Sequence, residues 1–193
     1  AETMYSWQIT NFANQDKMVM HSFWSRANVI FFFAVSTLAV MSGGCAISFY
    51  FHDVELQASI PKAEVLRFRH VRRGQVSGDN VFMAFDLDAD LTPVWNWNTK
   101  QLFVFVTANY ETKKKKINEV VVWDTIIEEK DNSVLKYSNQ KAKYPIIGLH
   151  GNLKGTPMNL TLRWDIMPNV GMMKFGGGLK HNHLAIKLPK EYK

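Results

Sequence analysis

Alternating aspartates are the first pattern in this sequence that could bind a metal ion. Asp86, Asp88 and Asp90 are spaced like the first ligands of a calcium-binding loop. Such a loop has glycine at its sixth position and glutamate at its twelfth, whereas this sequence has Leu91 and Trp97 there. Because alternate residues of a strand point to the same face, we interpret the three aspartates as solvent-facing carboxylates of a β-strand.

Two further patterns share some features of ligand-binding motifs. His181 and His183 would project from one face of a strand, as two zinc ligands must, but no third ligand is close in the sequence. Residues 176–178 are glycines, but they lack the Lys-Ser/Thr pair of a phosphate-binding loop. We interpret the histidines as solvated and the glycines as a flexible loop, and we predict no metal site and no cofactor.

Serine and histidine residues are present, but none lies in a signature of nucleophilic catalysis. The nucleophile elbow of the hydrolases is absent from the sequence. The candidates occur singly, and they are Ser59, Ser77, Ser133, Ser138, His70 and His150. The sequence therefore predicts no catalytic residue and favours a protein that is not itself an enzyme.

One short motif concerns covalent modification. Asn159-Leu160-Thr161 is the only Asn-x-Ser/Thr sequon of the chain. Alternation over residues 159–166 puts Leu160 on the apolar face of a strand and Asn159 on the polar face, where a glycan can be tolerated. We therefore predict N-glycosylation at Asn159.

An uncharged apolar run separates a short N-terminal segment from the rest of the chain. No formal charge occurs between Arg26 and Asp53, and about 20 helical residues suffice to cross a bilayer. We predict a tail at residues 1–26, a transmembrane helix at 27–51 and one large domain at 52–193. The alternatives are a cleaved signal peptide, whose apolar core has about 7–15 residues, and the buried helix of a soluble protein. The run is too long for the first and lacks the polar face of the second, so an anchor is favoured.

The charges that flank the run indicate its orientation. Lys17 and Arg26 precede it, whereas Asp53 and Glu55 follow it, and the positive-inside tendency then puts the N-terminus in the cytosol. Together with the sequon, this predicts a single-pass protein of the endoplasmic reticulum membrane with its C-terminal domain in the lumen. The lone cysteine, Cys45, falls inside the run, so the large domain forms no disulfide.

The net charge of +6 could suggest a nucleic-acid partner. Much of the excess, however, lies in the four lysines at 113–116, and no arginines or aromatic residues are interleaved with them. We interpret this run as a solvated hairpin loop between two strands. The sequence thus predicts membrane lipid as a partner, but not nucleic acid.

Period-two patterns beyond the apolar run predict β-strands. Apolar residues alternate over 81–91 and 159–166, and again over 184–188. Residues 102–108 and 120–127 are apolar on both faces, which is typical of interior strands.

These strands predict an all-β domain, an antiparallel β-sandwich of about seven strands that follows the single transmembrane helix. Several tryptophans are expected to supply much of its core, namely Trp95, Trp97, Trp123 and Trp164.

Several collinear segments resemble signal peptidase complex subunit 3. They are 20–23, 25–28, 97–103, 108–112, 118–124, 151–155, 159–164 and 168–171. The resemblance runs from about Met20 to the end, so we expect the natural chain to begin near Met20. It implies a non-catalytic, single-pass subunit that supports the serine-protease subunit of the complex, which removes signal peptides from nascent secretory and membrane proteins. The implied partners are that catalytic subunit and the other subunits of the complex.

Two classes of alternative function remain open at this stage. The first is a stand-alone, membrane-anchored lumenal hydrolase. The second is a binding module, such as a lectin or adhesion domain that is secreted after cleavage of a signal peptide.

Overall fold

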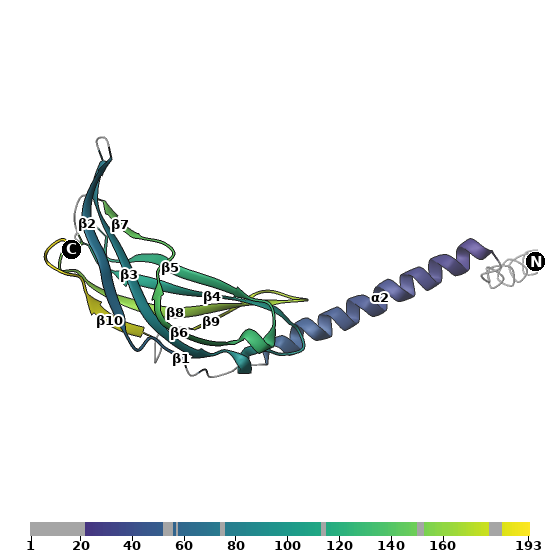
Figure 1. The fold of residues 1–193 in the computed structure, drawn as a ribbon. Coiled ribbons are helices and arrows are strands. Elements are labelled where there is room, and N and C mark those ends of the chain that lie inside the picture. The colour runs from purple at the N-terminus through teal and green to yellow at the C-terminus, as the bar shows by residue number, and fades with distance from the viewer. Residues whose placement is uncertain are drawn as a thin grey trace, which may run out of the picture. The chain divides into compact units, whose positions relative to one another are not determined.

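The computed structural model describes residues 22–51, 56, 58–73, 76–112, 115–149, 153–177 and 183–193. The chain divides into two compact units, Ala1–Ile47 and Ser48–Lys193. The first contains most of one long helix and the second contains the β-strands, and the two are described separately below (Figure 1).

Helix α2 (Phe23–Tyr50) has the length and composition of a membrane span. Its 28 residues extend about 42 Å at 1.5 Å per residue, which is more than the hydrocarbon core of a bilayer requires. No charged residue occurs after Arg26, and large apolar side chains such as Ile30, Leu38 and Val40 are exposed all around it. A helix that is apolar on all sides is suited to contact with membrane lipid.

Hydroxyl groups of α2 are hydrogen-bonded within the helix itself. The Ser22 Oγ accepts a hydrogen bond of 3.1 Å from the backbone N–H of Ser25, which caps the helix N-terminus. The Ser36 and Thr37 hydroxyls both donate to the carbonyl of Phe33, at 2.9 and 2.8 Å. This satisfies polar groups that would find no water partner inside a bilayer.

The second unit is an antiparallel β-sandwich of two five-stranded sheets, which confirms the predicted fold class. The first sheet is centred on β3 (Val76–Asp90), which pairs with β2 (Ala63–Arg73) and β1 (Ala58–Ser59) and, on its other side, with β6 (Val134–Lys141) and β7 (Ile146–Leu149). We call it sheet A. A short 3-10 helix, η1 (Thr92–Val94), follows β3.

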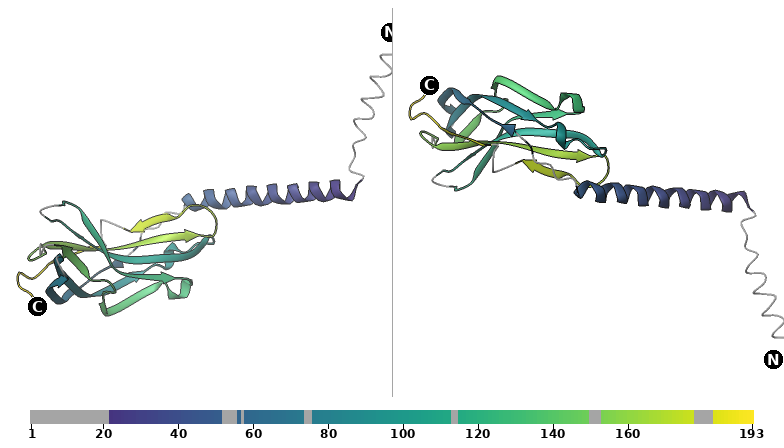
Figure 2. Two further views of the ribbon diagram at one scale, coloured as in Figure 1. Left: turned by 90° about the horizontal axis from the view of Figure 1, so that it is seen from above. Right: turned by 90° about the horizontal axis from the view of Figure 1, so that it is seen from below.

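Sheet B faces sheet A as the second layer (Figure 2). Its strand order is β10 (His183–Lys187), β8 (Pro157–Pro168), β4 (Thr99–Tyr110) and β5 (Asn118–Ile127). A further short strand, β9 (Lys174–Gly177), pairs with the C-terminal half of β8. A second 3-10 helix, η2 (Lys130–Asn132), connects β5 to β6.

The apolar faces of the predicted strands meet in one core. The alternation over 81–91 is confirmed, since the apolar residue at every second position is buried. In β8 the residues at 160, 162, 164 and 166 are likewise buried, as predicted. The predicted hairpin also forms between β4 and β5, where Thr112 and Lys115 exchange backbone hydrogen bonds; Lys113 and Lys114 lie outside the described residues.

The prediction that 102–108 and 120–127 are both interior strands is right for only one of them. Strand β4 is interior because it lies between β8 and β5. Strand β5 instead ends sheet B, and Val121 and Ile126 are exposed on it. Strand β5, which is apolar on both faces as interior strands are, therefore lies at an edge of sheet B in the described structure.

Two further predictions were wrong, one about the burial of a tryptophan and one about the glycine segment 176–178. Trp123 and Trp164 are buried and Trp95 packs against the core, but Trp97 is 64% exposed in the turn that precedes β4. The predicted flexible glycine loop at 176–178 is in part a strand, since Gly176 and Gly177 belong to β9. Gly178 lies outside the described residues.

The glycines of β9 allow this strand to lie flat on Trp164. A Cβ at Gly176 would overlap the indole of Trp164, and one at Gly177 would lie 2.8 Å from the Cα of Arg163. Gly177 also has a φ of +84°, which disfavours other residues. Close contact with a buried indole, rather than flexibility, thus accounts for the two glycines.

We expect Gly176→Ala to destabilise the domain by about 1–3 kcal/mol, because the added methyl group must displace either β9 or the Trp164 indole. The thermal unfolding midpoint of the full-length protein in detergent measures this loss. Gly43→Ala is the control, because a Cβ there meets no atom within 4 Å. Equal midpoints for the two variants would contradict the packing described here.

Candidate functional site

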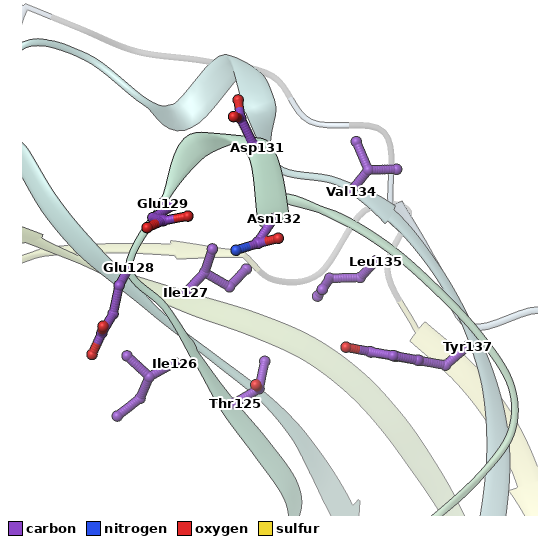
Figure 3. A pocket seen from close by; sticks show the side chains of 10 residues that line it. All are labelled: Thr125, Ile126, Ile127, Glu128, Glu129, Asp131, Asn132, Val134, Leu135 and Tyr137. Atoms are coloured by element: carbon purple, nitrogen blue, oxygen red, sulfur yellow. The ribbon is translucent and has the colours of Figure 1, made fainter.

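A groove opens between the edge strands of the two sheets, where β5 ends and β6 begins (Figure 3). Its volume is about 580 Å³, within the range of about 300–1,000 Å³ of typical ligand pockets. The last residues of β5, the η2 turn and the first residues of β6 line it, and Figure 3 labels all ten of them. We call it the edge groove.

Apolar side chains form the floor of the edge groove, but polar side chains make up most of its accessible lining. Ile127 and Leu135 are buried between the sheets, and Tyr137 extends from β6 beside Leu135 (Figure 3). Ile126 and Val134 are 53% and 50% exposed on either side. These two β-branched side chains leave some apolar surface uncovered at the edges that border the groove.

The rim of the edge groove is acidic. Glu128, Glu129 and Asp131 line it, and no lysine or arginine is among the described residues that do so. Lys130 lies in η2 between Glu129 and Asp131 but does not line the groove. On β6, Lys136 lies near Asp90, whose pKa is lowered mainly by hydrogen bonding from Thr92 and to a smaller degree by Lys136. The groove is therefore a local concentration of negative charge on a chain of net positive charge.

The β6–β7 connection contacts β5 at residues that precede the edge groove. The Tyr144 backbone N–H donates to the carbonyl of Val122 on β5 at 3.0 Å, and Lys143 Nζ lies 3.6 Å from an oxygen of Asp124. The Tyr144 hydroxyl also bonds to Asp124, which raises the pKa of that phenol. These contacts cover the edge of β5 at Val122, whereas the edge from Thr125 onward has no strand partner among the described residues.

The predicted glycosylation site lies in β8, on the outer face of sheet B. The Asn159 side chain is exposed, between Asn109 on β4 and Ala185 on β10. Thr161, which the alternation over residues 159–166 also puts on the polar face, is only 4% exposed. Its hydroxyl accepts a hydrogen bond of 3.2 Å from the Asn109 amide, because β8 is flanked on both edges and neighbouring side chains cover it.

The outer face of sheet B also carries aromatic and charged residues. Phe103 and Phe105 stack with their ring centroids 5.2 Å apart. Arg163 forms an ion pair of 3.0 Å with Glu119. Burial raises the pKa of the Asp165 carboxyl, and Arg163 partly opposes this.

A buried polar cluster joins three distant parts of the β-sandwich. The fully buried Asp79 on β3 accepts a hydrogen bond of 2.9 Å from the Tyr192 hydroxyl and one of 3.0 Å from the backbone N–H of Leu153. His70 on β2 lies 3.2 Å from the same carboxylate. The partners of His70 in the described structure are thus a carboxylate and a phenol, at 3.2 and 3.3 Å, and neither is a serine.

The polar cluster holds the C-terminus of the chain on sheet A. Lys193 and Phe68 exchange two backbone hydrogen bonds of 2.7 and 2.9 Å, and Tyr192 packs on Phe68 with 5.1 Å between ring centroids. The Lys154 Nζ lies over the Tyr192 ring, 3.6 Å from its centroid, and forms a cation–π contact with it. Burial raises the pKa of Tyr192, and the hydrogen bond to Asp79 adds to this.

The remaining residues singled out in the sequence are not brought together. Asp86, Asp88 and Asp90 alternate along β3 away from the core, and Asp86 accepts a hydrogen bond from the Asn139 backbone. His183 is exposed at the start of β10, and His181 lies outside the described residues. Within the described ranges, no three histidine, cysteine, aspartate or glutamate side chains gather as a metal site requires.

Sequence reasoning missed both the polar cluster and the edge groove. A signal for the first exists, because Asp79 shares the inward parity of Val81 and Met83 on β3. A charge at an inward position must be hydrogen-bonded. The groove had a weaker signal, an apolar run at 120–127 followed directly by Glu128 and Glu129.

Comparison with known proteins places this architecture in a family. Residues 20–191 match the family described as "Signal peptidase subunit". The chain is 35% identical over 177 residues to "Signal peptidase complex subunit 3" of Gallus gallus and 33% identical over 176 residues to the protein of that name from Homo sapiens. Both alignments cover 90% of this chain and 97% of the relative. The protein of that name from Drosophila melanogaster is 36% identical over 157 residues, covering 80% of this chain and 88% of the relative.

The aligned region contains both the apolar helix α2 and the whole β-sandwich that follows it. The resemblance noted in the sequence is thereby confirmed: this chain belongs to the signal peptidase subunit family, together with the proteins named signal peptidase complex subunit 3.

Proposed function

We propose that this protein is a non-catalytic accessory subunit of the endoplasmic reticulum signal peptidase complex. In this role it supports the serine-protease subunit that removes signal peptides from nascent secretory and membrane proteins. The observation that carries the proposal is the family match over residues 20–191, which extends across helix and β-sandwich alike. The partners are the catalytic subunit, the other subunits of the complex and membrane lipid.

The topology that we propose has residues 1–26 in the cytosol, one transmembrane span and residues 52–193 in the lumen. Supporting it are Arg26, the last charged residue before the apolar surface of α2, and the acidic residues that follow the helix in the sequence. A lumenal domain without a cysteine needs no disulfide for its stability, since the described core already contains large buried side chains from both sheets.

We also propose that Asn159 carries an N-linked glycan. Its side chain is exposed, and a glycan there would extend from the outer face of sheet B. Because the folded sheet covers Thr161, the sequon is accessible only before β8 pairs with its neighbours. The glycan would therefore be added to the chain before the domain has folded.

We expect Asn159→Gln to abolish a glycosidase-sensitive mass shift of the protein isolated from cells. Asn109→Gln is a matched control, because Asn109 lies beside Asn159 but is followed by Tyr110 and Glu111 and forms no sequon. Electrophoresis before and after glycosidase treatment measures the shift. A wild-type protein without any shift would argue against lumenal placement of the domain.

Affinity purification from gently solubilised membranes tests the proposed membership. The tagged full-length chain is expected to recover a serine-protease partner and the other subunits in stoichiometric amounts. A tagged chain lacking residues 23–50 controls for the part played by the membrane span. Recovery of the wild-type chain alone in mild detergent would contradict the proposal.

A further inference from the structure

We propose that the edge groove binds an extended, basic segment of another subunit of the complex, which adds as a strand to the open edge of β5. The inference rests on the proposed function, because it draws its partner from the signal peptidase complex. It assigns one surface of the β-sandwich to that contact.

The first argument is the unpaired edge of β5. The strand pairs only with β4, and the β6–β7 connection covers its other edge at Val122. Beyond that point Thr125–Ile127 has no partner strand in the described structure, over about 10 Å of extended chain. Edge strands of this kind present free N–H and carbonyl groups, to which an extended peptide can add.

The second argument is the sequence of that edge. Soluble proteins protect free edges with charged residues, proline or bulges. The open part of β5, Thr125-Ile126-Ile127, has none of these residues and is instead of the type found inside sheets. Ile126 and Val134 are half exposed on opposite sides of the groove, where the side chains of an added strand would contact them.

The third argument is charge complementarity. Glu128, Glu129 and Asp131 line the groove beside its apolar floor, and no described cation lines it with them. With Lys130 included, residues 128–131 still have a net charge of −2. Lysine and arginine side chains have long apolar stems and a charged end, so their stems fit the floor and their charges fit the rim. A segment with at least one basic residue beside apolar ones is therefore the matching occupant, and an acidic segment or lipid headgroup is disfavoured.

Site-specific photo-crosslinking in intact membranes tests this contact. Val134→benzoylphenylalanine places the probe at the groove, and Ile147→benzoylphenylalanine places it at a similarly exposed position on β7 that does not line the groove. We expect irradiation to join Val134 to another subunit, at a segment that mass spectrometry shows to contain lysine or arginine. The Ile147 probe should not label that segment.

Charge reversal then tests the acidic rim. Glu128→Lys with Glu129→Lys should reduce the Val134 adduct by about tenfold or more, because the basic segment then meets like charge. Glu111→Lys with Glu191→Lys is the matched control: both residues are exposed and lie outside the groove, and the net charge changes equally. The unfolding midpoints of both double variants are measured to confirm that the domain still folds.

The outcomes separate this proposal from the proposed function. If the wild-type chain recovers the peptidase but Val134 gives no adduct, the groove proposal is overturned and membership of the complex stands. An adduct with a second copy of this chain, or with a segment free of basic residues, also overturns it. If the wild-type chain recovers no peptidase at all, the proposed function itself fails.

Discussion

A chain with Val35→Lys and Leu38→Lys is expected to lose stable integration into the membrane. Both residues lie near the middle of α2 and are exposed on its apolar surface. A lysine at the centre of a span disfavours insertion by about 2.5–3.5 kcal/mol, so two lysines disfavour it by about 5–7 kcal/mol. Alkaline extraction of membranes measures the effect: the wild-type chain should stay in the pellet, and the variant should move to the soluble fraction.

Position within α2 provides the control for this experiment. Phe23→Lys with Trp24→Lys adds the same charge in the first turn of the helix, three and two residues before Arg26. Lysine side chains near a helix end reach the interface, so we expect this variant to remain in the membrane. If the two double variants were extracted equally, α2 would not be a transmembrane anchor.

Replacement of Asp79 by alanine is expected to destabilise the β-sandwich by about 3 kcal/mol. The change removes the acceptor of the Tyr192 hydroxyl and leaves the backbone N–H of buried Leu153 without its partner. Hydrogen bonds to a charged group contribute about 1.5–3 kcal/mol each, and the relieved desolvation of the carboxylate offsets part of the sum. For a domain of this size, the unfolding midpoint should fall by about 6–12 °C.

The C-terminal segment should respond most strongly to Asp79→Ala. Tyr192 and Lys193 are held on sheet A by the buried cluster and by the hydrogen bonds to Phe68, so hydrogen exchange at Phe68 and Lys193 should accelerate. Asp88→Ala removes an exposed carboxylate of the same strand and should change the midpoint by less than about 2 °C. An unchanged midpoint for Asp79→Ala would show that the cluster does not stabilise the fold.

The fold was predictable wherever burial follows simple periodicity. The alternation in β3 and β8 identified their core faces because each of these strands has one face on the core and one on solvent or neighbouring side chains. The anchor was equally predictable, since the length of an uncharged run is itself the physical requirement for crossing a bilayer. The family resemblance rested in large part on segments that lie in β4, β5 and β8 and in the turn before β4.

The features that escaped prediction depend on which elements become neighbours. The run 120–127 has an interior sequence but lies at an edge, because β5 has β4 on one side and the described chain supplies no strand for the other. The glycine run predicted a loop, but Gly176 and Gly177 belong to β9, which pairs with β8 and lies on Trp164. Strand β6, with its mixed polar sequence, is defined only by its pairing to β3.

The candidate site was the least predictable part for the same reason. The edge groove combines the end of β5 with the start of β6, which pair with different strands in different sheets. No spacing in the sequence encodes that juxtaposition. The prediction of a glycan at Asn159, in contrast, needs only local sequence, because a sequon is a local motif and its strand shows clear alternation.

The central claim is that this chain is an accessory subunit and not the peptidase, and a cleavage assay on separated components tests it most directly. The complex recovered through the tagged chain should remove the signal peptide from a presecretory substrate, and a serine-directed covalent inhibitor should label only the partner. The chain purified away from that partner should be inactive. Cleavage by the isolated full-length chain, with the label on one of its own serines, would contradict the account.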